Sequence, residues 1–204
     1  MADRWGFPLA EWEARFDRWL TNPEGENLLE AQIFLDFRSI AGGLSLEPLT
    51  DRLRRASQNR PFLTALARSA LVFTPPLGLL GRLRFEEGSI NLKKGGLAAI
   101  VALARVYGLE AQSLARPTLE RLRAAALARV ISKEEAEDLS EAFLFLSHLR
   151  LRHQLQALAQ GQPPTNRVAQ AALTPRELQV LRQVFLRIRQ AQQTLAARFR
   201  LQVL

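Results

Sequence analysis

The chain has 204 residues and a formal net charge of +8, and it contains no cysteine. This length suits one domain, or one domain with a fragment of another, and the lack of cysteine excludes thiol catalysis, cysteine zinc sites and disulfide scaffolds. No apolar run approaches the roughly 20 residues that a membrane span needs, and the first residues do not resemble a signal peptide, so we expect a soluble, cytoplasmic protein without membrane association.

The basic charge is carried almost entirely by arginine, because lysine occurs only at Lys93, Lys94 and Lys133. Arginine spread through Ala/Leu-rich segments reflects genome composition or thermal adaptation as readily as a binding surface, so we do not expect nucleic acid as a partner. The two histidines, His148 and His153, are five residues apart and do not share a helix face. We therefore expect no metal site in this chain.

Helical periodicity dominates the first half of the sequence. Apolar residues at 9, 12, 16, 19 and 20 predict an amphipathic first helix, and residues 46–58 and 61–73 predict a helical pair. Only residues 31–43 favour a strand, because Ile33, Leu35 and Phe37 occupy alternate positions before a glycine pair. The segment TPPLG then breaks the chain, and the following RFEEGSINL is expected to form a short hairpin or an irregular loop.

The second half is predicted to be helical, with clear signals for where helices start. We expect helices from about Leu97 and over residues 118–128. Capping boxes at 132–135 and 174–177 start two long helices, the first ending near Gly161 and the second close to the C-terminus. A polar, proline-containing connection joins these two as antiparallel neighbours. The predicted fold class is mainly α, an antiparallel helical bundle with a short strand-like segment near the N-terminus.

Polar residues interrupt the apolar stripes of both long helices. Gln192 falls on the stripe of the last helix, and Arg150 and His153 replace apolar residues in the preceding one, with Gln154 beside them. Burial of such groups without partners costs several kcal/mol. The pattern therefore predicts either a satisfied structural network or a solvated cleft for an anionic ligand, in which Arg150 and Arg152 supply charge and His153 donates a hydrogen bond or carries a proton.

A further signal is the segment NLKKGG, which directly precedes the apolar helix expected from about Leu97. That helix would direct free backbone amides toward a KKGG loop, where Lys93 and Lys94 add full positive charges. The spacing matches neither a Walker loop nor a dinucleotide fingerprint. The segment is either an anion-binding helix start or a turn that leads into a core helix.

Several dispersed motifs together resemble a known family. From about Trp12 to the C-terminus, the chain resembles the bacterial putative nucleotidyltransferases whose C-terminal part is called the substrate-binding domain. That family is similar to the uridylyltransferases of nitrogen signalling, and its members often carry cyclic-nucleotide-binding and CBS domains in signal-transduction proteins. The matching segments, in order, are FLDFRSIAGG, PPLG, INLKKGGLAAIVALARVYGL, PTLERLRAA, EAFLFLSHLRLRHQ and AARFRL.

The resemblance implies an all-helical bundle downstream of a mixed α/β catalytic domain. Residues 1–44 would be the tail of that nucleotidyltransferase-like domain, and residues 45–204 the helical substrate-binding domain. Asp36 and Arg38 would match an Asp-x-Arg motif in which Asp36 is an accessory carboxylate of the active site. The remaining substrate-binding positions that the resemblance implies are Lys93, Gly96, Arg105, Arg150, Arg152, His153 and Gln154, to which the stripe pattern adds Gln192.

The chain departs from the family pattern in ways that affect catalysis. Asn91 stands where an Asp is expected, and Pro117 stands where an Asn is expected. Nucleotidyl transfer in this superfamily needs a Gly-Ser turn and an Asp-x-Asp pair that holds metal ions, and this chain has no Asp-x-Asp. We therefore expect a chain that is not catalytically complete by itself and holds no cofactor. Mg²⁺ and a nucleoside triphosphate would belong to the complete enzyme, with a catalytic nucleotidyltransferase domain as partner and an acceptor protein or a nucleotide as ligand.

Two other functions compete with this reading. The bundle could be a protein-interaction module, with a homodimer formed through the exposed strand and the first helix. The segment LTPRELQVLRQV resembles the start of the helix-turn-helix in LuxR-type response regulators, which would make the chain a DNA-binding regulator. However, the residues that follow continue a helical pattern without the glycine turn that such a motif needs.

Overall fold

The computed structural model describes residues 5–202 and shows a mainly α-helical fold, as predicted. Short elements accompany the helices: a π-helical turn at Lys93–Leu97, 3₁₀ turns at Leu79–Gly81 and Gln170–Ala172, and two strands, β1 at Ser89–Asn91 and β2 at Arg167–Ala169. The α-helices are α1 Leu9–Thr21, α2 Gly25–Phe34, α3 Glu47–Ala56, α4 Arg60–Leu71, α5 Ala98–Glu110, α6 Thr118–Leu127, α7 Lys133–Ala159 and α8 Pro175–Phe199.

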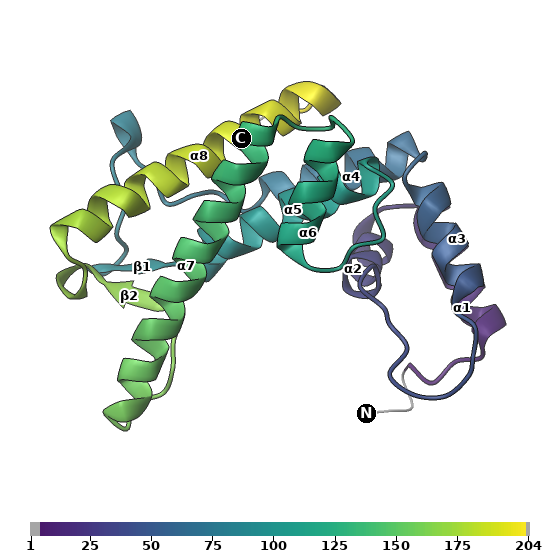
Figure 1. Ribbon diagram of the computed structural model, residues 1–204, viewed down its shortest axis with the longest axis horizontal. Helices are drawn as coiled ribbons and strands as arrows, with labels where there is room; N and C mark the ends of the chain where they lie inside the picture. Colours follow the sequence, from purple (N-terminus) through teal and green to yellow (C-terminus); the bar gives the residue numbers. More distant parts are fainter. Residues whose placement is uncertain (1–4, 203–204) are drawn as a thin grey trace.

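Helix α5 forms the centre of the bundle. It is apolar on nearly all sides and contacts α3, α4, α6 and α8, which is the expected position for a helix without a polar face. The long helix α7 packs against α6 and α8, and its C-terminal end extends beyond the body of the bundle (Figure 1). Helices α1, α2 and α3 lie together at the opposite end of the molecule (Figure 1).

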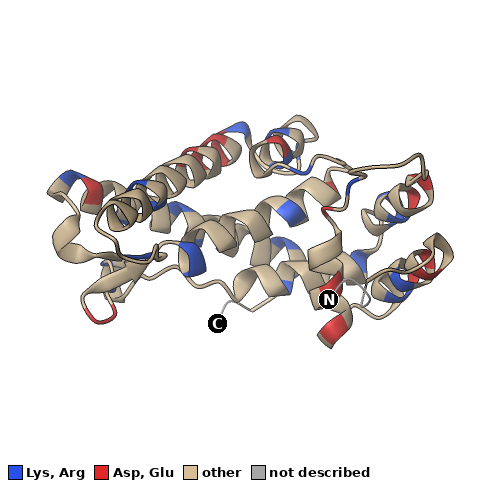
Figure 2. Ribbon diagram, turned by 90° about the horizontal axis from the view of Figure 1, so that it is seen from below, with Lys and Arg blue, Asp and Glu red and all other residues tan. Residues whose placement is uncertain are grey.

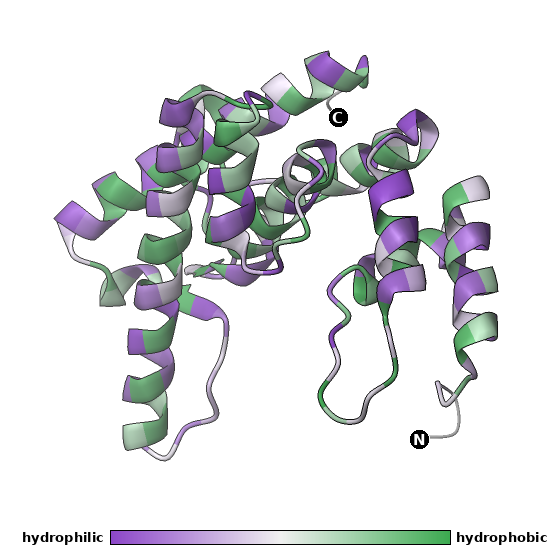
Figure 3. Cartoon of the chain, turned by 45° about the vertical axis from the view of Figure 1, so that its right-hand side comes forward, coloured by the Kyte–Doolittle hydropathy of each residue, from purple (hydrophilic) through white to green (hydrophobic). Residues whose placement is uncertain are grey.

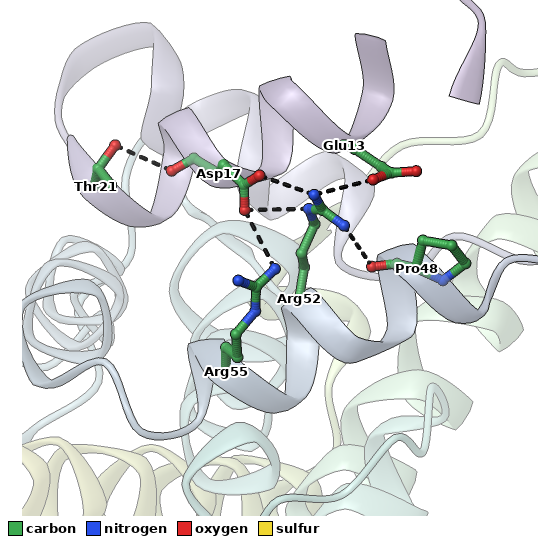
Figure 4. Close-up of polar contacts among 6 residues, drawn as sticks. All are labelled: Glu13, Asp17, Thr21, Pro48, Arg52 and Arg55. Carbon is green, nitrogen blue, oxygen red and sulfur yellow. Dashed lines mark hydrogen bonds and ion pairs between the residues drawn. The ribbon is translucent and has the colours of Figure 1, made fainter. Parts of the chain in front are cut away.

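The three N-terminal helices are joined by charge and by aromatic packing. Arg52 of α3 donates to both carboxylate oxygens of Asp17 on α1 and lies 3.0 Å from a Glu13 oxygen, while Arg55 reaches Asp17 at 3.4 Å (Figure 4). The interior of this end is an aromatic cluster made of Trp12, Phe16, Trp19, Phe34 and Phe37. Packing between α1 and α3 therefore crosses residue 44, the predicted domain boundary.

The strand predicted at residues 31–43 was wrong. Residues 31–34 belong to α2, a turn follows, and the next residues are irregular up to α3. The alternation of apolar residues was misleading, because the buried side chains Ala31 and Leu35 are four apart and follow the helical period, whereas Ile33 is 67% exposed.

The small sheet joins two segments that are far apart in the sequence. Strands β1 and β2 pair antiparallel, with Ile90 opposite Val168, and this pairing ties the chain before α5 to the chain before α8. The predicted hairpin is present only as an isolated bridge between Glu86 and Ser89. The proline-containing connection between the long helices was thus correctly placed, but it also supplies a strand.

Side-chain caps fix where the long helices begin. Thr174 and Glu177 form the complete capping box predicted for α8. Ser132 caps α7 by accepting from the Glu135 amide, but the Glu135 carboxylate contacts the Tyr107 hydroxyl instead of closing a box. Helix α8 continues without interruption from Pro175 to Phe199, so this segment lacks the turn between two short helices that a helix-turn-helix requires.

No helix among residues 5–202 combines the length and the apolar character needed to cross a membrane. Lysine and arginine positions are spread over the helices and are interleaved with acidic ones (Figure 2). They do not form the single basic stripe that is typical of nucleic-acid binding.

The cap of α8 predicts a pH-dependent contribution to stability. A hydrogen bond from Arg152, with further bonds from Thr174, lowers the pKa of Glu177 from 4.5 to about 2. Because the folded-state pKa lies below the unfolded one, this stabilisation is present above about pH 5 and is lost as the pH falls toward 2. Glu177→Gln should therefore lower the free energy of unfolding at pH 7 by about 1 kcal/mol, and the difference from the unmodified chain should disappear near pH 2.

Urea unfolding at a series of pH values measures this effect. Glu134→Gln is the matched control, because Glu134 lies in the first turn of α7 but is exposed and makes no printed side-chain bond. A Glu177→Gln difference that stayed constant across the whole pH range would contradict the assignment.

Candidate functional site

A cavity of about 400 Å³ lies between α5 and α7. Its walls also include α2, the chain after α4 and the π-helical turn. Three of the lining side chains are cations, and no carboxylate lines it. The lining consists of the cations Lys93, Arg105 and Arg150, the polar residues Gln32 and Ser147, and the apolar residues Phe73, Leu97, Ala98, Val101, Ala102 and Phe143.

The cations of the cavity are largely free to bind a ligand. Lys93 and Arg150 make no hydrogen bond or ion pair with any residue in the described range 5–202. The Nη2 atom of Arg105 donates to Asp36, but its buried Nε atom has no partner. Cations that converge on a cavity without acidic neighbours create a positive potential, so the geometry favours an anion.

The π-helical turn places Lys93 at this cavity. The helix begins at Lys93 and not near Leu97, so the expected KKGG loop was wrong: these four residues are helical. The side-chain oxygen of Asn91 accepts from the Lys93 and Lys94 amides at 3.0 and 2.9 Å. Those two amides are therefore already occupied, and the positive charge at the cavity comes from the Lys93 side chain. An aspartate at position 91 could accept the same two bonds.

Two glycines in this turn permit close packing on both of its sides. A Cβ atom on Gly95 would lie 2.6 Å from the Thr74 carbonyl oxygen, and one on Gly96 would lie 2.8 Å from a methyl group of Leu146. The predicted substrate-binding position Gly96 is thus buried against α7. Lys93 and Lys94 consequently line different cavities, and the second cavity, also about 400 Å³, contains Lys94.

Asp36 connects the N-terminal segment to the cavity. Its two carboxylate oxygens accept from Arg105 of α5, at 2.7 Å, and from Arg121 of α6. Burial raises the pKa of Asp36, but hydrogen bonds and charges from these two arginines outweigh it and hold the pKa below its ordinary value. Arg116 also donates to the Phe37 carbonyl at 2.7 Å. In this structure Asp36 is an ion-pair partner, and its role as an accessory carboxylate stays a prediction.

Sequence reasoning missed Arg121, which is only 7% exposed. It lies on the buried face of α6, and a Cβ atom on Gly108 would lie 2.9 Å from its side chain, so the missing side chain at 108 makes room for it. A cationic residue four before Ala125 on an otherwise apolar face was the available signal.

The other predicted residues lie outside the cavity. Arg152 pairs with Glu177 at 2.6 Å, and its Nη2 lies 3.2 Å from the ring Nε2 of His153. Because arginine only donates, this ring nitrogen must accept, and burial together with the Arg152 charge lowers the pKa of His153. Gln154 donates to the Thr165 carbonyl in the connection before β2, and Arg38 is exposed without a printed partner.

Gln192 is buried in the core at 4% exposure. Its amide nitrogen donates to the carbonyls of Ala70 and Phe73 at 3.0 and 2.9 Å, which satisfies the end of α4. This is the satisfied network that the stripe pattern allowed, and it also fixes the chain at Phe73, in the cavity wall. The structure therefore brings together Lys93, Arg105 and Arg150 and leaves the other predicted residues elsewhere.

The described residues contain no group of three or more His, Cys, Asp or Glu side chains that could hold a metal ion. The cavity also lacks carboxylates, so its residues do not fit a resident divalent cation.

Comparison with known proteins gave one family match. A family model described as "Putative nucleotidyltransferase substrate binding domain" matches residues 60–199. This range contains all three cavity cations and excludes α1, α2 and α3. No curated protein and no solved structure matched the chain.

The close packing at the π-helical turn predicts that added methyl groups destabilise the fold. Gly95→Ala and Gly96→Ala should each lower the free energy of unfolding by about 1–3 kcal/mol, partly offset by the better helix propensity of alanine. The loss should be larger for Gly95, since Thr74 contributes a backbone atom that moves less easily than the Leu146 side chain. Chemical denaturation measures both, and Gly43→Ala, where a Cβ meets nothing within 4 Å, should be close to neutral. Equal stability of all three variants would contradict this packing.

The Asp36 ion pairs predict a second effect on stability. Asp36→Asn should lower the free energy of unfolding by about 1–3 kcal/mol, because it removes the charge that faces the buried Arg121. The estimate is moderated because the Asp36 side chain is 34% exposed. Asp51→Asn is the control, since its contact with Arg54 is exposed on both sides and should contribute little. Urea unfolding that gave the same change for both variants would show that Asp36 holds no structural role.

Proposed function

The chain belongs to the "Putative nucleotidyltransferase substrate binding domain" family, and from this we propose that the cavity between α5 and α7 binds the anionic part of the substrate. The observation that supports the proposal is the convergence of Lys93, Arg105 and Arg150 on a cavity without carboxylates. Two of these cations have no partner in the described part of the chain, which leaves them available for a ligand.

The cavity residues divide into charged and apolar groups that suit different parts of one ligand. Lys93 would supply a compact charge to a phosphate or carboxylate, and the planar guanidinium of Arg150 would supply paired hydrogen bonds. Ser147 and Gln32 add neutral donors, while Phe73 and Phe143 offer aromatic surface for a ring. A nucleotide, or an acceptor that carries an anionic group, fits this combination.

We propose that the domain positions such a ligand for a companion catalytic nucleotidyltransferase domain in a bacterial signal-transduction protein. The chain lacks the Asp-x-Asp pair, and both oxygens of Asp36 are held by arginines, so catalysis requires residues from the companion. Mg²⁺ would be held by that companion, because the residues of this cavity do not fit it. Lys93, Arg105 and Arg150 would bind and orient the anion.

A second candidate function is a protein-interaction module that binds no nucleotide. Exposed leucines along α7 favour it, since a row of such residues is typical of a surface that another helix covers. An acceptor protein could be recognised in this way even if the cavity binds no nucleotide.

Calorimetric titration with ATP, CTP, GTP and UTP tests the proposal, with and without Mg²⁺ in moderate salt. We expect saturable binding of at least one nucleotide, weakened about tenfold or more in Lys93→Ala and in Arg150→Ala. Lys94→Ala is the matched control, because it removes the same charge from the neighbouring residue but faces the other cavity. It should bind nearly as well as the unmodified chain.

The possible outcomes separate the candidate functions. Equal weakening in Lys93→Ala and Lys94→Ala would indicate nonspecific attraction to a basic chain and would contradict the site. Absence of binding to all four nucleotides would remove the nucleotide from this chain and favour the interaction module.

A further inference from the structure

The outer face of α7 carries a row of exposed leucines. Leu144, Leu151, Leu155 and Leu158 are 43%, 53%, 57% and 54% exposed, on the side of the helix opposite the buried residues Ala142, Leu146 and Leu149. With His148, which is also exposed, they follow alternating steps of four and three residues. That spacing is typical of the contact line between two helices of a coiled coil, so this face has the pattern of one half of a helix pair.

The row begins in the bundle and continues onto the projecting end of α7. At its start, Leu144 lines an apolar groove of about 680 Å³ between α6 and α7, together with Ala126 and Leu127, and Leu127 is 78% exposed. From there α7 extends past the body, and hydrophobic residues recur along that end (Figures 1 and 3). The chain thus presents a groove and a projecting apolar helix end on the same face of α7.

The charges of α7 differ between its two halves. Residues 133–141 contain five carboxylates and one lysine, whereas residues 142–159 contain two arginines and two histidines and no carboxylate. Two copies of α7 that ran parallel would place like charges side by side. Two antiparallel copies would place the acidic half of each against the basic half of the other, which is favourable.

We propose that the outer face of α7 is a dimer interface, occupied by α7 of a second copy of this chain in antiparallel orientation. Leu144 of one copy then lies against Leu155 of the second, and His148 lies against Leu151. Leu158 of the second copy reaches the groove beside Leu127. The same surface serves both copies, so the contact closes on itself and forms a dimer and no longer assembly. This interface differs from the strand and first helix that the sequence suggested.

The extent of the contact sets the strength of the dimer. Four helical turns and one groove form an interface at the small end of the range for specific complexes. The dimer should therefore be weak and should dissociate on dilution.

Sedimentation velocity of the 204-residue chain over a dilution series tests the proposal. We expect a reversible monomer–dimer equilibrium whose dissociation constant rises about tenfold or more in Leu151→Glu, at the centre of the row. The variant should fold normally, because glutamate favours helices and the side chain is half exposed. Leu29→Glu, on exposed α2, is the matched control and should leave the equilibrium unchanged. A chain that stayed monomeric at every concentration, or a dimer insensitive to Leu151→Glu, would overturn the proposal.

Cross-linking tests the orientation, because the chain has no cysteine of its own. A mixture of the His148→Cys chain and the Leu151→Cys chain should form a disulfide between the two variants on mild oxidation, since these positions face each other in the antiparallel pair. The Leu144→Cys chain alone should not cross-link, because its two copies would lie roughly 16 Å apart along the helix axis. Efficient cross-linking of Leu144→Cys to itself would instead indicate a parallel pair and would overturn the antiparallel assignment.

Discussion

The packing of the π-helical turn Lys93–Leu97 is the constraint on which the rest of the structure depends. Gly95 allows the Thr74–Pro76 segment to approach on one side, and Gly96 allows α7 and α8 to approach on the other. The central helix α5 begins at this turn, so its position among the other helices is set here. The same turn directs two neighbouring lysines to two different cavities. Close packing and the candidate binding site therefore have one origin, which explains why small residues and cations are adjacent in the sequence.

Sequence patterns predicted the long helices well because their determinants are local. The capping residues Ser132 and Thr174 and the 3.6-residue period fix α7 and α8 without reference to other parts of the chain. The pairing of β1 with β2 could not be predicted, since each strand has three residues and they are far apart in sequence. The false strand at 31–43 had a different cause: α2 is short, and several of its apolar residues are exposed, which obscured the helical period.

The candidate site could be predicted in part. Arg150 was identified from its place on an apolar stripe, and Lys93 from its place before an apolar helix, because each departs from the pattern of its own element. Arg105 was found only through the resemblance to a family, and Gln32 was missed because its segment was assigned to a strand. A cavity is formed by residues from several elements, so sequence alone identifies the unusual members and not the neutral ones such as Ser147.

Helix α7 shows why Arg150 and Gln192 could not be distinguished from sequence, although both interrupt an apolar stripe. Gln192 lies where α8 is enclosed, so its amide must bond to the carbonyls at the end of α4. Arg150 lies on α7, which has three faces with separate surroundings: Leu146 and Leu149 face the core, Phe143, Ser147 and Arg150 face the cavity, and the exposed leucines face outward. A helix that is apolar on two of its three faces gives little indication of which face is buried in the monomer. Because the cavity and the leucine row lie on different faces, pairing of two copies along the row would leave the cavity accessible to a ligand.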